Sequence, residues 1–249
     1  MPVQSDNEYI YGIIEEPQPR KFEFRGLEDA QVYTINYQHL AAVVSTIRFG
    51  EIDPTRKNVL AHTLVQDELL KKYTLLPMGF GIVTASEDNV LRLLEKNYEA
   101  LVRELSRLAG KIEAELKIFW DEKALTGEHQ ELLSKLKAKI KSASSAAEAQ
   151  RLAIEAGMAV ERIIREWKNT YADQVYSSLK EVATDARLNA PGGVKNLLNA
   201  SFLIERVKES EFVEQVRRLD AQYKGKMNFK YVGPLSPYSF VGITLEPVK

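Results

Sequence analysis

The chain has 249 residues, with 34 lysines and arginines against 35 aspartates and glutamates, so its formal net charge is −1. This length corresponds to one large or two small domains. The absence of cysteine excludes disulfides, Cys-type zinc sites, iron–sulfur clusters and cysteine nucleophiles. The near-zero charge leaves no overall positive field that would attract nucleic acid or an anionic membrane.

Neither a membrane span nor a secretory signal is predicted. The sequence contains no run of about 18 apolar residues, which a membrane-spanning helix requires. Its start, MPVQSDNEYI, lacks a basic region followed by an apolar stretch. We therefore expect a cytoplasmic protein that binds neither a lipid membrane nor nucleic acid.

Three strands are predicted near the start of the chain, at residues 9–14, 31–37 and 40–47, from their β-branched and aromatic content. The third is almost continuously apolar, which is typical of a strand buried on both faces. Only residues 38–39 separate the second and third strands, so these two are predicted to form a hairpin. Residues 15–29, which contain two prolines, are predicted to be a loop.

Two helices are predicted in the first half. One begins with Asp53 as its N-cap and a proline in its first turn, and it ends near Tyr73. The other begins with Ser86 as its N-cap and ends at Gly110. Its apolar residues recur at helical spacing, with Tyr98 filling the gap in a stripe made of Val90, Leu94, Leu101, Leu105 and Leu108.

The pattern changes near residue 121, where a stretch of apolar heptads without proline begins. A first helical segment contains Leu133, Leu136, Ile140 and Ala143. After a capping box at Ser145, the apolar residues of a second segment step by three and four: Ala149, Ala153, Ala156, Val160, Ile163 and Trp167. Two such helices with a short link predict an antiparallel coiled-coil hairpin, whose second arm continues to about Leu188.

Further strands are predicted at residues 75–84, 112–119, 200–207 and 227–232, with a helix capped by Ser210 and a proline-rich turn at 233–240. Strands separated by helices in this way predict an α+β protein. We place its two domains at 1–120 and 121–249.

No catalytic, cofactor-binding or metal-binding residue is predicted. The three histidines, His39, His62 and His129, lie in different elements, and none has metal-ligand spacing to another. The glycines at 79 and 81 lack the third glycine and the Lys-Ser/Thr pair of a phosphate loop. They predict a bend in a strand instead.

Four stretches, taken together and in order, resemble the gas vesicle protein F/L family. They are Tyr9–Ile14 with the strand at 40–45, Leu75–Val83, Glu113–Asp121 and Gly233–Val241. Two of them carry the positions that match family motifs: Leu76, Pro77, Phe80, Gly81, Gly233, Pro234, Pro237, Tyr238 and Phe240.

This resemblance implies a non-enzymatic accessory protein for gas vesicle assembly, with the F-type favoured over the L-type. It also implies a ferredoxin-like N-terminal domain, followed by a second α+β domain that carries the coiled-coil hairpin. The expected partners are the hydrophobic shell subunit and other gas vesicle accessory proteins. The expected location is the gas vesicle within the cytoplasm, with an F-type member on the gas-facing side of the shell.

Two alternatives stay open. One is a coiled-coil adaptor or homodimeric scaffold built through the hairpin at 121–188. The other is an enzyme on a ferredoxin-like scaffold, which would require a pocket that brings His62 together with Asp67 or another carboxylate.

Overall fold

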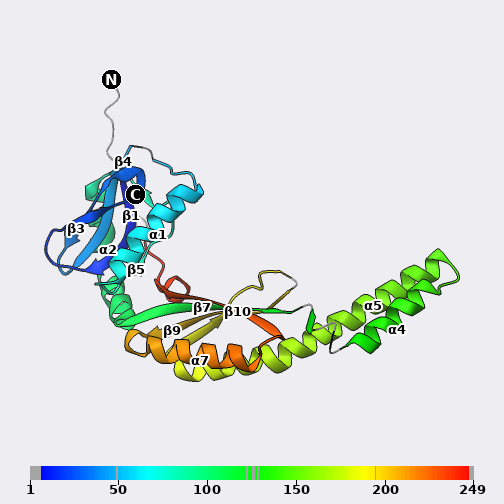
Figure 1. Cartoon of the computed structure of the whole chain (residues 1–249). Helices are drawn as coiled ribbons and strands as arrows, with labels where there is room; N and C mark the ends of the chain where they lie inside the picture. The colour runs from blue at the N-terminus through cyan, green and yellow to red at the C-terminus, as the bar shows by residue number, and fades with distance from the viewer. Residues whose placement is uncertain are drawn as a thin grey trace. The chain divides into compact units, whose positions relative to one another are not determined.

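A computed structural model of the chain describes residues 7–48, 50–121, 123, 124, 127, 129–193 and 195–246. It is a mixed α+β structure that divides into two compact units (Figure 1), Met1–Glu113 with Pro234–Lys249, and Ala114–Gly233. The sequence predicts a division at residue 120 that leaves the C-terminal tail with the second half. The compact units instead group this tail with the first half, where its hydrogen-bond partners lie.

The first unit contains a six-stranded sheet in the order β2-β3-β4-β1-β5, with β6 also paired to β1. Its strands are β1 (Asn7–Glu15), β2 (Lys21–Arg25), β3 (Gln31–Tyr37), β4 (Leu40–Ile47), β5 (Leu76–Pro77) and β6 (Val83–Thr84). The pairs are antiparallel. The predicted hairpin is confirmed, because Tyr37 pairs with Leu40 across a two-residue turn.

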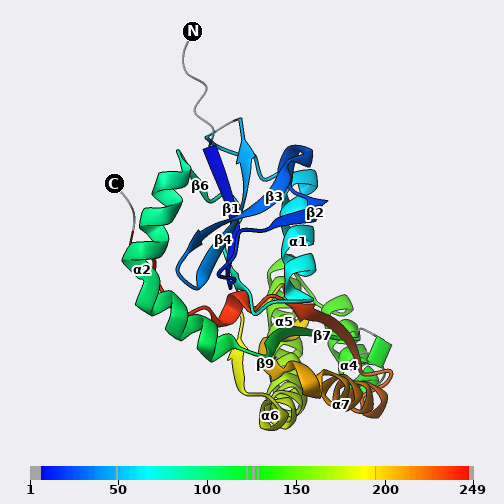
Figure 2. The same ribbon diagram turned by 90° about the vertical axis from the view of Figure 1, so that its left-hand side faces the viewer.

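Two helices pack against this sheet, α1 (Arg56–Leu70) and α2 (Glu87–Leu108). Figure 2 shows the strands of the sheet between α2 and α1. Successive residues of β1 and β4 point to opposite faces of the sheet, and almost all of them are buried. Both faces of the two central strands are therefore covered, and the core of the unit lies on both sides of the sheet.

Three predictions for the first unit need correction. The predicted loop at 15–29 contains the edge strand β2. The N-cap of α1 is Thr55 rather than Asp53, because the Thr55 side chain accepts the Asn58 N–H. The predicted strand at 75–84 is two short strands, separated by a turn in which Gly81 has a φ of +89°, a conformation that favours glycine. The Ser86 N-cap of α2 is confirmed.

The second unit contains a four-stranded sheet in the order β10-β7-β9-β8. Its strands are β7 (Lys111–Trp120), β8 (Asp185–Leu188), β9 (Asn196–Glu205) and β10 (Met227–Leu235), and the strand bounds of β7 and β10 extend slightly into the first unit. Its helices are α4 (Gln130–Lys141), α5 (Ala146–Trp167), α6 (Asp173–Val182) and α7 (Glu209–Gln222).

Helices α4 and α5 follow one another and lie side by side (Figure 1). A π-helical turn at Lys168–Ala172 joins α5 to α6. The helical stretch ends at Val182, because the residues predicted to continue it to Leu188 form β8, which pairs with β9. Ser210 lies inside α7, not at its cap. Within the part of the chain that the structure describes, no helix has the length and apolar character needed to cross a membrane.

Candidate functional site

The family-matching stretches of the first unit meet at one place, on the side of α1 that carries His62 and Gln66. Tyr9 of β1, Phe80 of the turn between β5 and β6, and Tyr238 of the tail all contact His62. We call residues 234–246 the C-terminal segment. The site is therefore a junction between this segment, β1 and the segment at 75–83.

His62 is the centre of the junction and is only 3% exposed. Its Nδ1 lies 2.8 Å from the Tyr9 hydroxyl, and its Nε2 lies 3.0 Å from the Tyr238 hydroxyl. The rings of Tyr11 and Phe80 lie 5.7 Å and 5.8 Å from the imidazole, between ring centres. Aromatic packing and two hydrogen bonds thus fix the imidazole in one orientation.

The hydrogen bonds around His62 fit one direction of donation. The Gly81 N–H donates to the Tyr9 hydroxyl over 3.0 Å, so we assign the Tyr9 proton to His62 Nδ1. The Nε2–H then donates to the Tyr238 hydroxyl. That hydroxyl in turn has acceptors in Gln66 Oε1, at 2.6 Å, and in the Met78 carbonyl, at 2.8 Å. In this arrangement a neutral imidazole satisfies both of its nitrogens.

Burial keeps the groups of the junction uncharged. Desolvation lowers the pKa of His62 to about 4 and raises the pKa of Tyr238 to about 12. Desolvation also raises the pKa of Tyr9. None of the three changes its charge near pH 7, as a general acid or base would need to. The arrangement is suited to joining chain segments.

Gln66 ties two of these segments together through the backbone. Its Nε2 donates to the Tyr11 carbonyl over 2.7 Å and to the Met78 carbonyl over 3.0 Å. The Met78 N–H also donates to the Tyr11 carbonyl, over 3.0 Å. Gly12 allows the close approach, since a Cβ there would lie 2.6 Å from Leu75 Cδ1 and 2.9 Å from the Leu76 carbonyl oxygen.

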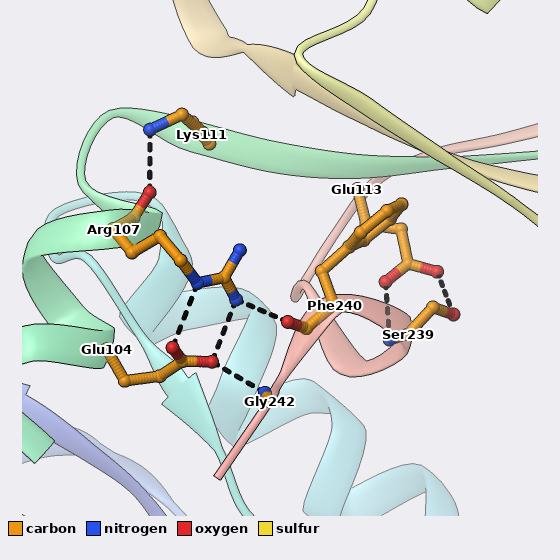
Figure 3. A network of polar contacts seen from close by, with 7 residues as sticks. All are labelled: Glu104, Arg107, Lys111, Glu113, Ser239, Phe240 and Gly242. Atoms are coloured by element: carbon orange, nitrogen blue, oxygen red, sulfur yellow. Dashed lines mark hydrogen bonds and ion pairs between the residues drawn. The ribbon is translucent and has the colours of Figure 1, made fainter. Parts of the chain in front are cut away.

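Side chains of α2 and β7 hold the backbone of the C-terminal segment (Figure 3). The Glu113 carboxylate accepts the Ser239 N–H at 2.9 Å and the Ser239 hydroxyl at 2.6 Å. The Glu104 carboxylate accepts the Gly242 N–H at 2.6 Å and binds Arg107 through two hydrogen bonds of 2.9 Å and 2.8 Å. Arg107 also donates to the Phe240 carbonyl.

Asn97, about two turns before Glu104 on α2, holds the end of the described segment. Its Oδ1 accepts the Glu246 N–H at 2.9 Å, and its Nδ2 donates to the Glu246 carbonyl at 3.3 Å. Because these groups bind backbone atoms, they compensate polar groups of an irregular segment that has no sheet partner for them. The Glu246 carboxylate pairs with Lys96 at 3.0 Å.

The structure brings together most of the motif positions. Leu76 and Pro77 form β5 and pair with β1. The positions in direct contact with His62 or Tyr9 are Phe80, Gly81 and Tyr238. Pro237 precedes the 3-10 turn at Tyr238–Phe240, whose Phe240 is fully buried. The two remaining positions lie at the boundary between the units, where Gly233 ends the second unit and Pro234 begins the tail.

His62 and Gln66 lie outside the family-resembling stretches and were not predicted to join these segments. Glu113 begins the stretch Glu113–Asp121, but no contact with the C-terminal segment was predicted for it. Two more, Asn97 and Glu104, do leave a signal. They lie on the buried face of α2, seven residues apart, in a stripe that is otherwise apolar. Polar residues buried within an apolar stripe indicate a specific hydrogen-bond partner.

His62 is not placed as an enzyme site would require. Both of its ring nitrogens bind tyrosine hydroxyls. Over the residues that the structure describes, no group of three or more His, Asp or Glu side chains is arranged to hold a metal ion.

Comparison with known proteins adds independent information. Residues 7–242 match the family model described as "Gas vesicle synthesis protein GvpL/GvpF". Gas vesicle protein F of Nostoc sp. strain PCC 7120 is 28% identical over 239 residues, covering 95% of this chain and 98% of that protein. Gas vesicle protein F of Streptomyces sp. strain CB03234 is 30% identical over 240 residues, covering 94% and 98%. The crystal structure of GvpF from Anabaena sp. PCC7120 superimposes with a TM-score of 0.80 at 28% identity, covering 96% of this chain and 100% of that chain.

Proposed function

Because the chain belongs to the GvpL/GvpF family of gas vesicle synthesis proteins, as its motifs indicated, we propose that it assists gas vesicle assembly by binding the hydrophobic shell subunit. The observation that carries this proposal is the family match, which extends over residues 7–242. The family consists of gas vesicle synthesis proteins and is not known as one of enzymes. The enzyme alternative is therefore set aside.

One surface of the first unit fits an apolar partner. Helix α1 buries Val65 and Leu69 in the core, yet its other side exposes three large apolar side chains: Val59, Leu60 and Leu64 are 39%, 55% and 52% exposed. Leu60 and Leu64 are one helical turn apart, so they lie on the same face. A shell subunit must present apolar surface before it assembles, and such surface aggregates in water unless it is covered.

The junction at His62 supports this role by holding α1 in place. Gln66 and His62 connect α1 to β1, to the segment at 75–83 and to Tyr238. With these contacts fixed, the exposed leucines are presented from a rigid helix, which lowers the entropy cost of binding.

The finer features of fold and location also remain proposals. The first unit is ferredoxin-like, which its antiparallel sheet and two packed helices support. Helices α4 and α5 form an antiparallel coiled-coil hairpin, which their heptads and mutual contact support. The protein is of the F-type and acts at the gas vesicle within the cytoplasm, on the gas-facing side of the shell, together with other accessory proteins. The F-type relatives support this assignment.

Co-expression with the shell subunit tests the proposal. We expect the tagged protein to keep the shell subunit soluble and to co-purify with it. The double variant Leu60→Gln, Leu64→Gln should lose most of the bound subunit while it remains folded. A shell subunit that is neither bound nor kept soluble by the unsubstituted protein would refute the proposal.

The adaptor alternative rests on a different surface, on α5. Ile154 and Met158 are 59% and 65% exposed there, one turn apart on the helix. The variant Ile154→Gln, Met158→Gln therefore serves as the matched control in the same experiment. If it alone abolishes capture, or if it alone changes the oligomeric state measured by light scattering, the adaptor reading is favoured over binding through α1.

A further inference from the structure

A basic pocket opens at one end of the sheet in the second unit, where β7, β9 and β10 are neighbours. It has a volume of about 440 Å³. Its walls are Phe119, Trp120 and Asp121 from the end of β7, Lys195 just before β9, and Asn228 and Lys230 from β10. Three adjacent segments therefore contribute to one concave site, which is separate from the His62 junction and from the exposed face of α1.

Two of the lysines are positioned by aromatic rings. Lys195 Nζ lies 5.5 Å from the centre of the Trp120 ring, and Lys230 Nζ lies 5.2 Å from the centre of the Phe119 ring. An ammonium group at this distance is attracted to the negative face of the ring. The rings thus hold two positive charges at the pocket wall. The half-buried Phe119 ring provides apolar surface beside them, whereas Trp120 is only 9% exposed.

Among the described wall residues, Asp121 is the acidic one, and local donors already engage its carboxylate. The Asp121 carboxylate accepts the Lys123 N–H at 2.8 Å, the Ala124 N–H at 3.1 Å and Asn228 Nδ2 at 3.5 Å. These hydrogen bonds, chiefly the one from Ala124, hold the pKa of Asp121 below its usual value. Lys123 also lines the pocket, so the described wall residues include three lysines and one aspartate, in a chain whose formal net charge is −1.

We propose that this pocket binds an acidic peptide segment of a partner protein, with a carboxylate near Lys195 and Lys230 and a neighbouring apolar side chain against the Phe119 ring. The combination of cationic and aromatic groups matches a segment in which acidic and apolar residues alternate. Within the described sheet β10 is the outermost strand, so an extended segment has room to run beside it. Three lysines around one pocket are fewer than the long basic stripe that nucleic acid requires.

Fluorescence of Trp120 provides a direct assay, since Trp120 lines the pocket, whereas the other of the two tryptophans, Trp167, lies at the end of α5. In the variant Trp167→Phe, Trp120 is the sole tryptophan and reports on its own pocket. We expect a short peptide of alternating Glu and Leu to change its emission in a saturable way, and added salt to weaken the binding. The same peptide with Gln in place of Glu should give no saturable change.

Charge removal separates the pocket from the general surface. In the Trp167→Phe background, Lys195→Gln with Lys230→Gln should weaken binding of the acidic peptide by roughly tenfold, because two exposed charge pairs are lost. Lys137→Gln with Lys139→Gln, which removes the same charge from α4, should leave the affinity unchanged.

Three outcomes would overturn the proposal. They are no saturable response to the acidic peptide, equal binding by the two double variants, and equally strong binding of inorganic phosphate alone. The last would mark a small-anion site instead. Because the assay uses neither the shell subunit nor the α1 face, its failure is distinguishable from failure of the proposed function.

Discussion

Removal of the Tyr238 hydroxyl tests whether the C-terminal segment stabilises the first unit through the His62 junction. In the variant Tyr238→Phe, His62 Nε2 loses its partner at 3.0 Å and Gln66 Oε1 loses its donor at 2.6 Å. Each buried polar group left without a partner costs about 1–3 kcal/mol. Tyr238 itself is 44% exposed, so water can replace part of what is lost. We therefore expect a loss near the lower end, about 2 kcal/mol in all.

Hydrogen exchange is the appropriate measurement, because it reports on each unit separately. Both tryptophans lie in Ala114–Gly233, so tryptophan fluorescence reports on the folding of the second unit. It serves as the reference for a unit that the substitution does not touch. A loss of about 2 kcal/mol corresponds to roughly 30-fold faster exchange of the most protected amides in the first unit.

The matched control is Tyr98→Phe on α2. Tyr98 packs against the Tyr37 ring, with 5.8 Å between ring centres, and that contact survives the substitution. This variant should exchange within about twofold of the unsubstituted protein. Unchanged exchange in Tyr238→Phe, or an equal effect of Tyr98→Phe, would refute the reasoning about the junction.

Other substitutions and conditions give further tests. Gly26→Ala should destabilise the first unit by about 1–3 kcal/mol, because the new Cβ would lie 2.0 Å from the Tyr11 hydroxyl oxygen. The control is Gly79→Ala, because a Cβ at Gly79 would meet open space. In urea unfolding this control should change the free energy of unfolding by less than about 0.5 kcal/mol. Glu104→Ala removes the acceptor of the Gly242 N–H and should lower the stability of this contact by about 1–3 kcal/mol. Hydrogen exchange of the Gly242 amide should then be faster than in the unsubstituted protein. Unchanged protection of that amide would contradict the assigned contact. The pKa of His62 is about 4 in the folded state against 6.5 in the unfolded chain, so the unfolded state binds more protons between these two pH values. The stability from neutral His62 is thus complete above pH 6.5 and falls as the pH drops, by about 2 kcal/mol at pH 5. Urea unfolding at pH 7.5 and pH 5 should show this fall in unfolding free energy in the unsubstituted protein. In the variant His62→Gln, the fall between these pH values should be smaller by about 2 kcal/mol, because glutamine does not titrate.

The elements predicted well are those whose signals are local. The strands at 31–37 and 40–47 match β3 and β4 because their alternation and apolar content lie within the strands themselves. Ser86 caps α2 as predicted because a cap depends on its own side chain and the next three residues. Such elements are encoded over fewer than about ten residues, and tertiary contacts do not override them.

The edge strand β2 and the His62 junction depend on partners that lie elsewhere in the chain, so local sequence signals do not predict them. Lys21–Arg25 does alternate, but it is short, lies between prolines and a glycine, and forms β2 only because β3 offers it a partner. The bond between Tyr238 and His62 joins residues 176 positions apart. Family motifs marked Tyr238 but not His62, since a partner so distant along the chain leaves no local pattern.

Gas vesicle formation in the source cells is the most direct test of the central claim, that this protein acts in assembly through the exposed face of α1. A strain that lacks the gene is complemented with the unsubstituted gene or with Leu60→Gln, Leu64→Gln, and pressure-collapsible turbidity is measured. We predict that the unsubstituted gene restores this turbidity and that the double variant, present at equal level, does not. Full turbidity with the double variant, or in the strain without the gene, would contradict the claim.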